Sequence, residues 1–272
     1  HILLPLAIFL SFALRANTQL SEEAKISLLT AAPGPDIYQL FGHSAIRVND
    51  PVNGIDDVYN WGTFDFETPN FTWKFMKGRL DYCLSVDPFF LFYPSYVKQQ
   101  RSVYEHELLL SPAQKQDMFD YMNWNALEEN RYYRYDFFFD NCATRIRDII
   151  DSIVAKPIHW PESELPADQS FRQLIDPYLA HTPFLDLGID LLLGSPSDAT
   201  SEVSGTMFLP DHLMQAFEGA RIGEMETSTP LTAKPITIYQ SPENDFPSPG
   251  IKPWMISLTV FMAALLVSMV EW

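Results

Sequence analysis

The apolar and polar positions of this chain form short runs separated by turn signals from about residue 18 to residue 192, which indicates one continuous folded body. Strict alternation over 45–48 predicts a short strand, with His43 just before it. Dense turn chemistry over 50–54 and a second strand over 57–66 follow. The segment therefore predicts a β-hairpin that carries His43 at the start of one strand and Asn60 on the other.

A helix is predicted directly after a third candidate strand, which covers 132–139 and is rich in Tyr and Phe. Isoleucines recur at helical spacing over 146–153 and give one buried face. Asn141 is a favourable N-cap residue, so Cys142 falls in the first helical turn. Unpaired N–H groups and the helix dipole favour negative charge at this place, so we expect a lowered pKa for the Cys142 thiol.

Both ends of the chain are apolar. Residues 2–14 form an uncharged run of 13 residues that fits the h-region of a secretory signal, so 1–17 is predicted as a signal peptide. Residues 253–270 are an uncharged run of 18, and the span 253–272 is predicted as a transmembrane helix truncated by the end of the sequence. A buried core helix is the alternative for 2–14, and an amphipathic or core helix is the alternative for 253–270.

The amino-acid composition changes between 194 and 250, where Pro, Ser, Thr and Gly are frequent and indicate loops and a linker. One helical island, 210–220, interrupts this stretch. The predicted organisation is a catalytic domain over 18–225 followed by a linker over 226–252.

Composition removes several classes of function. Hydrophobic residues make up 47% of the 272 residues, so the body of the chain is not disordered. The formal net charge of −17 repels nucleic acid, which we exclude as a partner. Two cysteines, with no CxxC and no Cys/His cluster of zinc spacing, predict no disulfide scaffold, no metal and no cofactor.

A cysteine at a helix start and a histidine on a distant strand suit a thiol nucleophile and its base. We therefore predict Cys142 as nucleophile and His43 as base, with Asn60 orienting the imidazole ring. Two alternatives stay open, because a free cysteine is usually buried and inert and because Cys83 could pair with Cys142 in an oxidising compartment.

Other reaction classes have weaker support. The sequence has no GxSxG elbow, no HExxH and no phosphate-binding glycine loop. His106 stands between Glu105 and Glu107, which is more typical of a solvated strand edge than of a metal site. The 35 acidic residues give no specific signature of a glycosidase.

Several long segments are distinctive as a set: FGHSAIRV (41–48), YNWGTFDF (59–66), PNF (69–71), RSV (101–103), ENRY (129–132) and YDFFFDNCATR (135–145). Together with 20–30 they resemble the Lnb N-terminal periplasmic domain family over roughly residues 18–225. That resemblance implies a membrane-anchored protein on the periplasmic face of the inner membrane of a Gram-negative bacterium. It also implies lipoprotein N-acylation, the transfer of a fatty acyl chain to the amine of a lipoprotein's lipidated cysteine.

The resemblance implies a fold as well. Residues 42–46 are similar to the "GHVGI" strand of NlpC-type peptidases, and Asn60 matches the position of their third polar residue. His43 precedes Cys142 here, as in the circularly permuted branch that includes lecithin:retinol acyltransferase. The implied fold is α+β, a circularly permuted papain-like (NlpC-type) domain whose antiparallel sheet packs on helices. Asn60 departs from the histidine of that pattern, which leaves the third catalytic role the least certain.

The implied reaction has two steps. Cys142 would take an acyl group from a membrane phospholipid as a thioester, and the N-terminal amine of a lipoprotein would then attack it. The aromatic segment 88–94 would contact lipid or, alternatively, belong to the core. Two rival functions remain: an NlpC-type peptidoglycan endopeptidase, and a non-catalytic periplasmic binding or assembly domain.

Overall fold

The computed structural model describes residues 18–64, 81–166, 168–242 and 252–270. The predicted signal peptide (1–17) and the PNF segment (69–71) lie outside these residues. The chain divides into two compact units, one made of 1–167 and 202–241 and the other of 168–201 and 242–272. The candidate chemistry belongs to the first.

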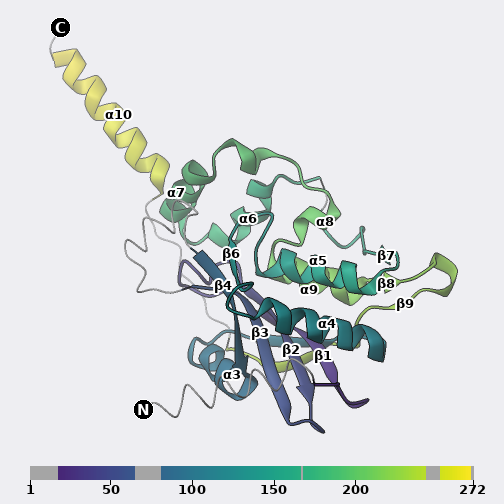
Figure 1. Ribbon diagram of the computed structural model, residues 1–272. Helices are drawn as coiled ribbons and strands as arrows, with labels where there is room; N and C mark the ends of the chain where they lie inside the picture. The colour runs from purple at the N-terminus through teal and green to yellow at the C-terminus, as the bar shows by residue number, and fades with distance from the viewer. Residues whose placement is uncertain (1–17, 65–80, 167, 243–251, 271–272) are drawn as a thin grey trace, which may run out of the picture. The chain divides into compact units, whose positions relative to one another are not determined.

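A seven-stranded antiparallel sheet organises the first unit, with strand order β10-β5-β1-β2-β3-β4-β6 (Figure 1). The strands are β1 (Lys25–Ala31), β2 (His43–Asp50), β3 (Ile55–Thr63), β4 (Asp81–Pro88), β5 (Val103–Glu107), β6 (Tyr132–Arg134) and β10 (Ile236–Tyr239). The helices of this unit are α3 (Phe89–Lys98), α4 (Pro112–Asn125), α5 (Cys142–Val154), α8 (Val203–Thr206) and α9 (Pro210–Gly219). A small sheet of β7 (Ile158–His159), β8 (Arg221–Ile222) and β9 (Thr229–Pro230), with the 3-10 turn η2 (Met225–Thr227), completes it.

Helices cover both faces of the large sheet. Alternate side chains along each strand point to opposite sides, so each strand contributes to the packing on both faces. One face packs against α4, α5 and α9, which lie beside one another (Figure 1). Tyr59 and Trp61 of β3 point to this side and donate hydrogen bonds to Asn123 and Asn125 of α4, at 2.8 and 3.0 Å. The opposite face, with Val58, packs against Phe92 of α3. The mixed α+β fold with an antiparallel sheet on helices, which the resemblance implied, is therefore confirmed.

The local predictions hold for the hairpin and for the helix. β2 and β3 pair from Ile46↔Tyr59 to Asp50↔Ile55 around the expected turn, and α5 begins at Cys142. The predicted strand over 132–139 is wrong beyond Arg134. Asp136 instead accepts backbone hydrogen bonds from Phe138 and Phe139, which holds that segment in a turn. Aromatic content favours a strand, but the side chain of Asp136 offers the backbone another partner.

His106 is also placed differently from the prediction of a solvated edge. It lies on β5 between β1 and β10 and is 1% exposed. The flanking residues Glu105 and Glu107 point to the opposite face of the strand, so their polarity does not indicate the environment of His106.

The second unit contains α6 (Phe171–Leu179), α7 (Pro183–Leu193), the 3-10 turn η1 (Ser195–Asp198) and α10 (Pro253–Val270). Arg172 ties this unit together by pairing with Asp190 and Asp198 and by donating to the carbonyl of Gly194.

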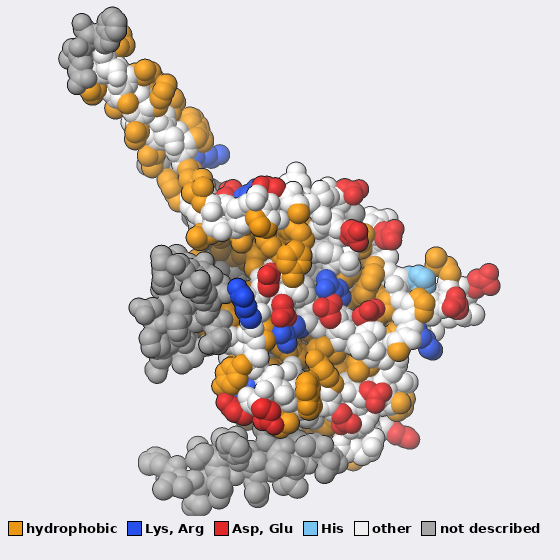
Figure 2. All heavy atoms as spheres, turned by 45° about the horizontal axis from the view of Figure 1, so that its top comes forward, with side chains coloured by type: hydrophobic (Ala, Val, Ile, Leu, Met, Phe, Trp, Pro, Cys, Tyr) orange, Lys and Arg blue, Asp and Glu red, His pale blue; other side chains and the backbone are white. Residues whose placement is uncertain are grey.

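The transmembrane helix predicted over 253–272 is not confirmed. Within the described residues, no helix combines the length and the apolarity that a bilayer crossing needs. Helix α10 carries exposed apolar side chains along its visible face (Figure 2). The domain limits at 225 and 252 stay a prediction, although part of the expected linker forms β10 at the edge of the sheet.

Candidate active site

Asn141 fixes the start of α5 and with it the position of Cys142. Its Oδ1 accepts the backbone N–H groups of Ala143 and Thr144 at 2.8 and 2.9 Å, and Thr144 Oγ1 accepts the N–H of Asn141 in return. Its Nδ2 donates to the carbonyls of Phe137 and Phe208 at 2.8 and 2.9 Å. The cap is therefore tied to three segments of chain, and the thiol that follows it, 7% exposed, is held firmly.

His43 and Asn60 come from the two strands of the hairpin and meet by a hydrogen bond of 2.6 Å between His43 Nε2 and Asn60 Oδ1. Because a carbonyl oxygen can only accept, this bond places the ring proton on Nε2. The other nitrogen, Nδ1, is then left without a proton and can accept one. Asn60 thus sets the tautomer that a general base requires.

Gly62 makes the space in which histidine and cysteine approach. The β3–β4 register shifts between Trp61 and Thr63, and Gly62 at this bulge has φ +94°. A Cβ built on Gly62 would lie 3.8 Å from His43 Cε1 and 3.9 Å from Cys142 Cβ. The two side chains therefore flank one point, and only the absence of a side chain leaves it open.

Burial decides the protonation of the thiol. Desolvation raises the pKa of Cys142 to about 11, although the backbone N–H groups of Ser44, Ala143 and Cys142 itself and the charge of Arg101 act to lower it. The predicted lowering by the helix start is present, but loss of water around the sulfur outweighs it. The expectation of a lowered pKa is therefore wrong in its net direction.

The pKa of the His43 imidazole is shifted in the opposite direction, downward. Desolvation lowers the pKa of His43 to about 4, the bond to Asn60 opposes this shift, and Arg101 adds to it. At neutral pH the pair is consequently a neutral thiol beside a neutral imidazole. Neither side chain carries a charge in this state.

Tyrosines and a buried arginine surround the pair. Tyr82 stacks on Tyr135 with ring centroids 4.3 Å apart, and the negative form of Cys142 raises the pKa of both phenols beyond the shift that burial causes. Arg101 influences both Cys142 and His43. The sequence alone did not assign Arg101, Tyr82 or Tyr135 to the site. Arg101 and Tyr135 belong to the distinctive segments RSV (101–103) and YDFFFDNCATR (135–145), which is the only signal that could have found them.

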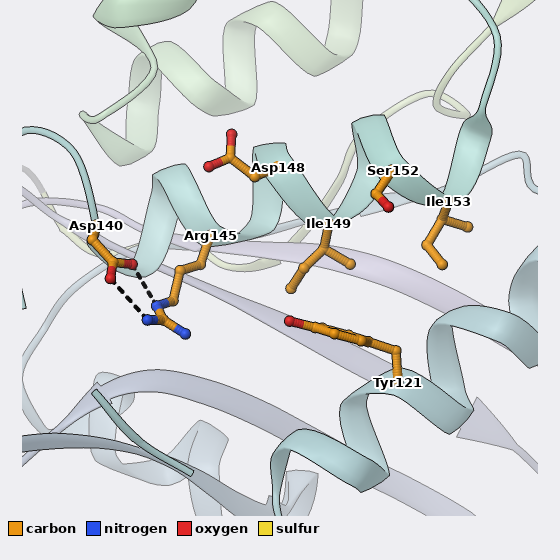
Figure 3. A pocket seen from close by; sticks show the side chains of 7 residues that line it. All are labelled: Tyr121, Asp140, Arg145, Asp148, Ile149, Ser152 and Ile153. Atoms are coloured by element: carbon orange, nitrogen blue, oxygen red, sulfur yellow. Dashed lines mark hydrogen bonds and ion pairs between the residues drawn. The ribbon is translucent and has the colours of Figure 1, made fainter. Parts of the chain in front are cut away.

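Cys83 has a separate position on β4. Both cysteines are free thiols, so the alternative of a Cys83–Cys142 disulfide does not hold. An open pocket of about 290 Å³ is lined by residues of α4 and α5, but by none of His43, Asn60 and Cys142 (Figure 3). There Arg145 is already paired with Asp140, through Nε at 2.6 Å and Nη2 at 2.8 Å.

One group of three carboxylates could hold a cation within the described residues. Asp176, Asp186 and Asp190 of the second unit each offer an oxygen within 4.8 Å of the others. Arg172 pairs with Asp190 and already supplies positive charge to this group. We assign no metal to it.

The site defines a class of protein, an α+β domain with a thiol, an imidazole and an amide gathered at one end of an antiparallel hairpin. The chain belongs to the family described as the Lnb N-terminal periplasmic domain, whose model matches residues 14–176. It is accordingly a periplasmic domain. Comparison with curated proteins gives no match, and comparison with solved structures gives none either.

The raised pKa of Cys142 predicts how its alkylation depends on pH. In a Cys83→Ser variant, the rate with iodoacetamide should rise nearly tenfold per unit between pH 7 and pH 9.5, because only the thiolate reacts. Mass spectrometry of quenched samples measures the rate. A rate that levels off below pH 8 would contradict the neutral thiol.

The lowered pKa of His43 predicts a loss of stability in acid. Between pH 6.5 and about 4 the unfolded histidine binds a proton that the folded one does not, so stability falls as pH falls through this range. A His43→Gln variant lacks this titration. Its free energy of unfolding in urea should fall by about 2 kcal/mol less than that of the wild type between pH 7 and pH 4.5. Equal losses in both proteins would show that His43 titrates normally.

Proposed function

We propose that this chain is a cysteine-dependent acyltransferase that takes a fatty acyl group from phospholipid and delivers it to the N-terminal amine of lipoproteins. One observation carries the proposal. The hydrogen bond of 2.6 Å between His43 and Asn60 stands beside Cys142 at the capped start of α5. Membership of the Lnb family supports the proposal, and the substrate class is the one that the resemblance to this family implies.

We further propose that the fold is a circularly permuted papain-like domain. In the papain-like arrangement a cysteine at a helix start faces a histidine on a sheet, and a polar residue on the next strand orients the ring. Cys142, His43 and Asn60 occupy such places here. The order along the chain, histidine before cysteine, supports the permuted branch, whose lecithin:retinol acyltransferase member moves acyl groups through a thioester.

In the first step, His43 Nδ1 takes the proton of the Cys142 thiol while the sulfur attacks an ester carbonyl of the phospholipid. The S–C bond forms, the C–O bond to glycerol breaks, and the proton passes from His43 to the leaving oxygen, which gives a lysophospholipid. The backbone N–H groups of Ser44 and Ala143 face the sulfur, and N–H groups at this helix start would stabilise the oxyanion.

In the second step, the α-amine of the lipoprotein attacks the thioester carbonyl. The N–C bond forms and the S–C bond breaks, while His43 accepts the proton of the amine and returns it to the sulfur. An α-amine has a pKa of roughly 7.7–8.0, so a fraction of it is neutral and nucleophilic at working pH.

The surroundings of the thiol favour an acyl chain over a polar peptide. Desolvation dominates the pKa shifts of Cys142, of His43 and of the nearby Tyr82 and Tyr135, which describes a site poor in water. At the start of α3, Phe90 and Leu91 are 71% and 60% exposed, while Phe92 belongs to the core. These exposed groups suit contact with a lipid surface.

A test of the function uses intact-protein mass spectrometry. Wild-type protein incubated with phospholipid vesicles should gain one acyl adduct on Cys142, which hydroxylamine removes because it is a thioester. Cys142→Ala should gain none, and a synthetic diacylglyceryl lipopeptide should discharge the adduct and become N-acylated. If the Cys142→Ala variant N-acylates the lipopeptide at the wild-type rate, the thioester route is wrong. Release of peptides from purified peptidoglycan would favour the endopeptidase.

Gly62→Ala should lower the acylation rate at least tenfold, because alanine strains the backbone at φ +94° and its methyl group would contact His43 Cε1 and Cys142 Cβ at 3.8 and 3.9 Å. Gly54→Ala is a matched control. Gly54 also has positive φ (+65°), but no atom lies within 4 Å of its built Cβ. Both variants should lose about 1–2 kcal/mol of stability from backbone strain in urea unfolding, and only Gly62→Ala should lose activity. Equal losses of activity in the two variants would show that the position of Gly62 beside His43 and Cys142 has no specific role in catalysis.

A further inference from the structure

Arg101 is a buried arginine that uses only part of its hydrogen-bonding capacity. It is 5% exposed. Its Nε donates to the carbonyl of Ala32 at 2.7 Å and its Nη1 donates to Gln99 Oε1 at 3.1 Å, but its Nη2 has no hydrogen-bond partner among the residues that the structure describes. None of the ion pairs among the described residues includes Arg101. A buried charged donor without an acceptor carries an uncompensated desolvation penalty. The unpaired Nη2 group therefore indicates that a ligand supplies the acceptor.

The sheet brings Arg101 to the end at which His43 begins β2. Val103 of β5 pairs with Ala31 of β1, and Ala31 pairs with His43. The ladder continues past this row, because the N–H of Ala32 donates to the carbonyl of Ser102 at 2.8 Å. Arg101 therefore stands next to the last rung of the sheet, two strands away from His43.

The chain around Arg101 is built to admit its side chain. A Cβ on Gly34 would lie 2.9 Å from Arg101 Cδ and 2.5 Å from Gln39 Oε1, so a larger residue at 34 would displace both. The guanidinium also lies over the ring of Tyr96, at 5.1 Å from its centroid. These contacts hold the stem and one face of the group, and they leave Nη2 for another acceptor.

We propose that Arg101 is the anion-binding residue of the donor site and that its Nη2 donates to the phosphodiester of the phospholipid whose acyl group Cys142 accepts. The inference rests on the proposed function. An arginine suits phosphate because its planar N–H groups match phosphate oxygens. The ester carbonyls of a glycerophospholipid lie only a few bonds from its phosphate, so a lipid attacked by Cys142 brings an anionic oxygen to this end of the sheet. A neutral ester has no anionic oxygen for Nη2.

The experiment compares a charged donor with a neutral one. Acylation of Cys142 is measured by intact mass with phosphatidylglycerol in detergent micelles and, separately, with p-nitrophenyl laurate. For Arg101→Gln we expect a loss of about tenfold to a hundredfold with the phospholipid, as for one charged hydrogen bond. With the neutral ester we expect a rate within threefold of the wild type. Arg101→Lys, which keeps the charge without the planar group, should fall between these limits.

Arg47→Gln is the matched control, since Arg47 is another poorly exposed arginine but pairs with Asp56 and Glu105. Its rates with both donors should equal those of the wild type, and thermal melting should show all variants folded. Equal losses with both donors in Arg101→Gln, or no loss with either, would overturn the inference while leaving the thioester route intact. A wild type that reacts with the neutral ester but with no phospholipid would overturn the proposed donor, and this inference with it.

Discussion

Strand β3 leaves β2 after the pair formed by Tyr59 and Ile46, and the bulge at Gly62 changes its register with β4. This divergence is the constraint on which the site depends. It frees the backbone N–H of Ser44 to face the sulfur of Cys142, and it leaves room for the first turn of α5 beside the start of β2. Tyr59 and Trp61 hold the strand through buried hydrogen bonds to α4, which covers the same face of the sheet as α5, so the opening is fixed by packing rather than by a loop.

The same geometry explains why the protonation states differ from those expected at a helix start. Asn141 Oδ1 accepts the N–H groups of Ala143 and Thr144 and so fixes the helix start, and the backbone N–H groups of Ser44, Ala143 and Cys142 favour the thiolate. Packing the sulfur against the sheet removes its water, and desolvation of a charge is the larger effect. His43 meets the same conditions in reverse, because burial disfavours its imidazolium form. At neutral pH the result is a neutral thiol and a neutral imidazole.

Local patterns predicted the elements that local forces determine. The hairpin and the helix with its N-cap follow from alternation, turn residues and capping, and they brought His43, Asn60 and Cys142 forward as candidates. Arg101 could not be assigned from the sequence, because its role depends on two strand pairings that join residues 31, 43 and 103. Burial of His106 and of the thiol also depends on helices distant in sequence. The turn at Asp136 escaped prediction because one side chain overrode an aromatic strand pattern.

Under the proposed function, the dry surroundings of the sulfur also bear on the choice between transfer and hydrolysis. A thioester is open to attack by any nucleophile that reaches it, and water is the competitor of the lipoprotein amine. Cys142 is only 7% exposed, so little water reaches its sulfur before the second substrate arrives. His43, neutral because of the same burial, is then ready to take the proton of the amine. The burial that makes the thiol a weak acid would therefore also preserve the acyl-enzyme for the amine.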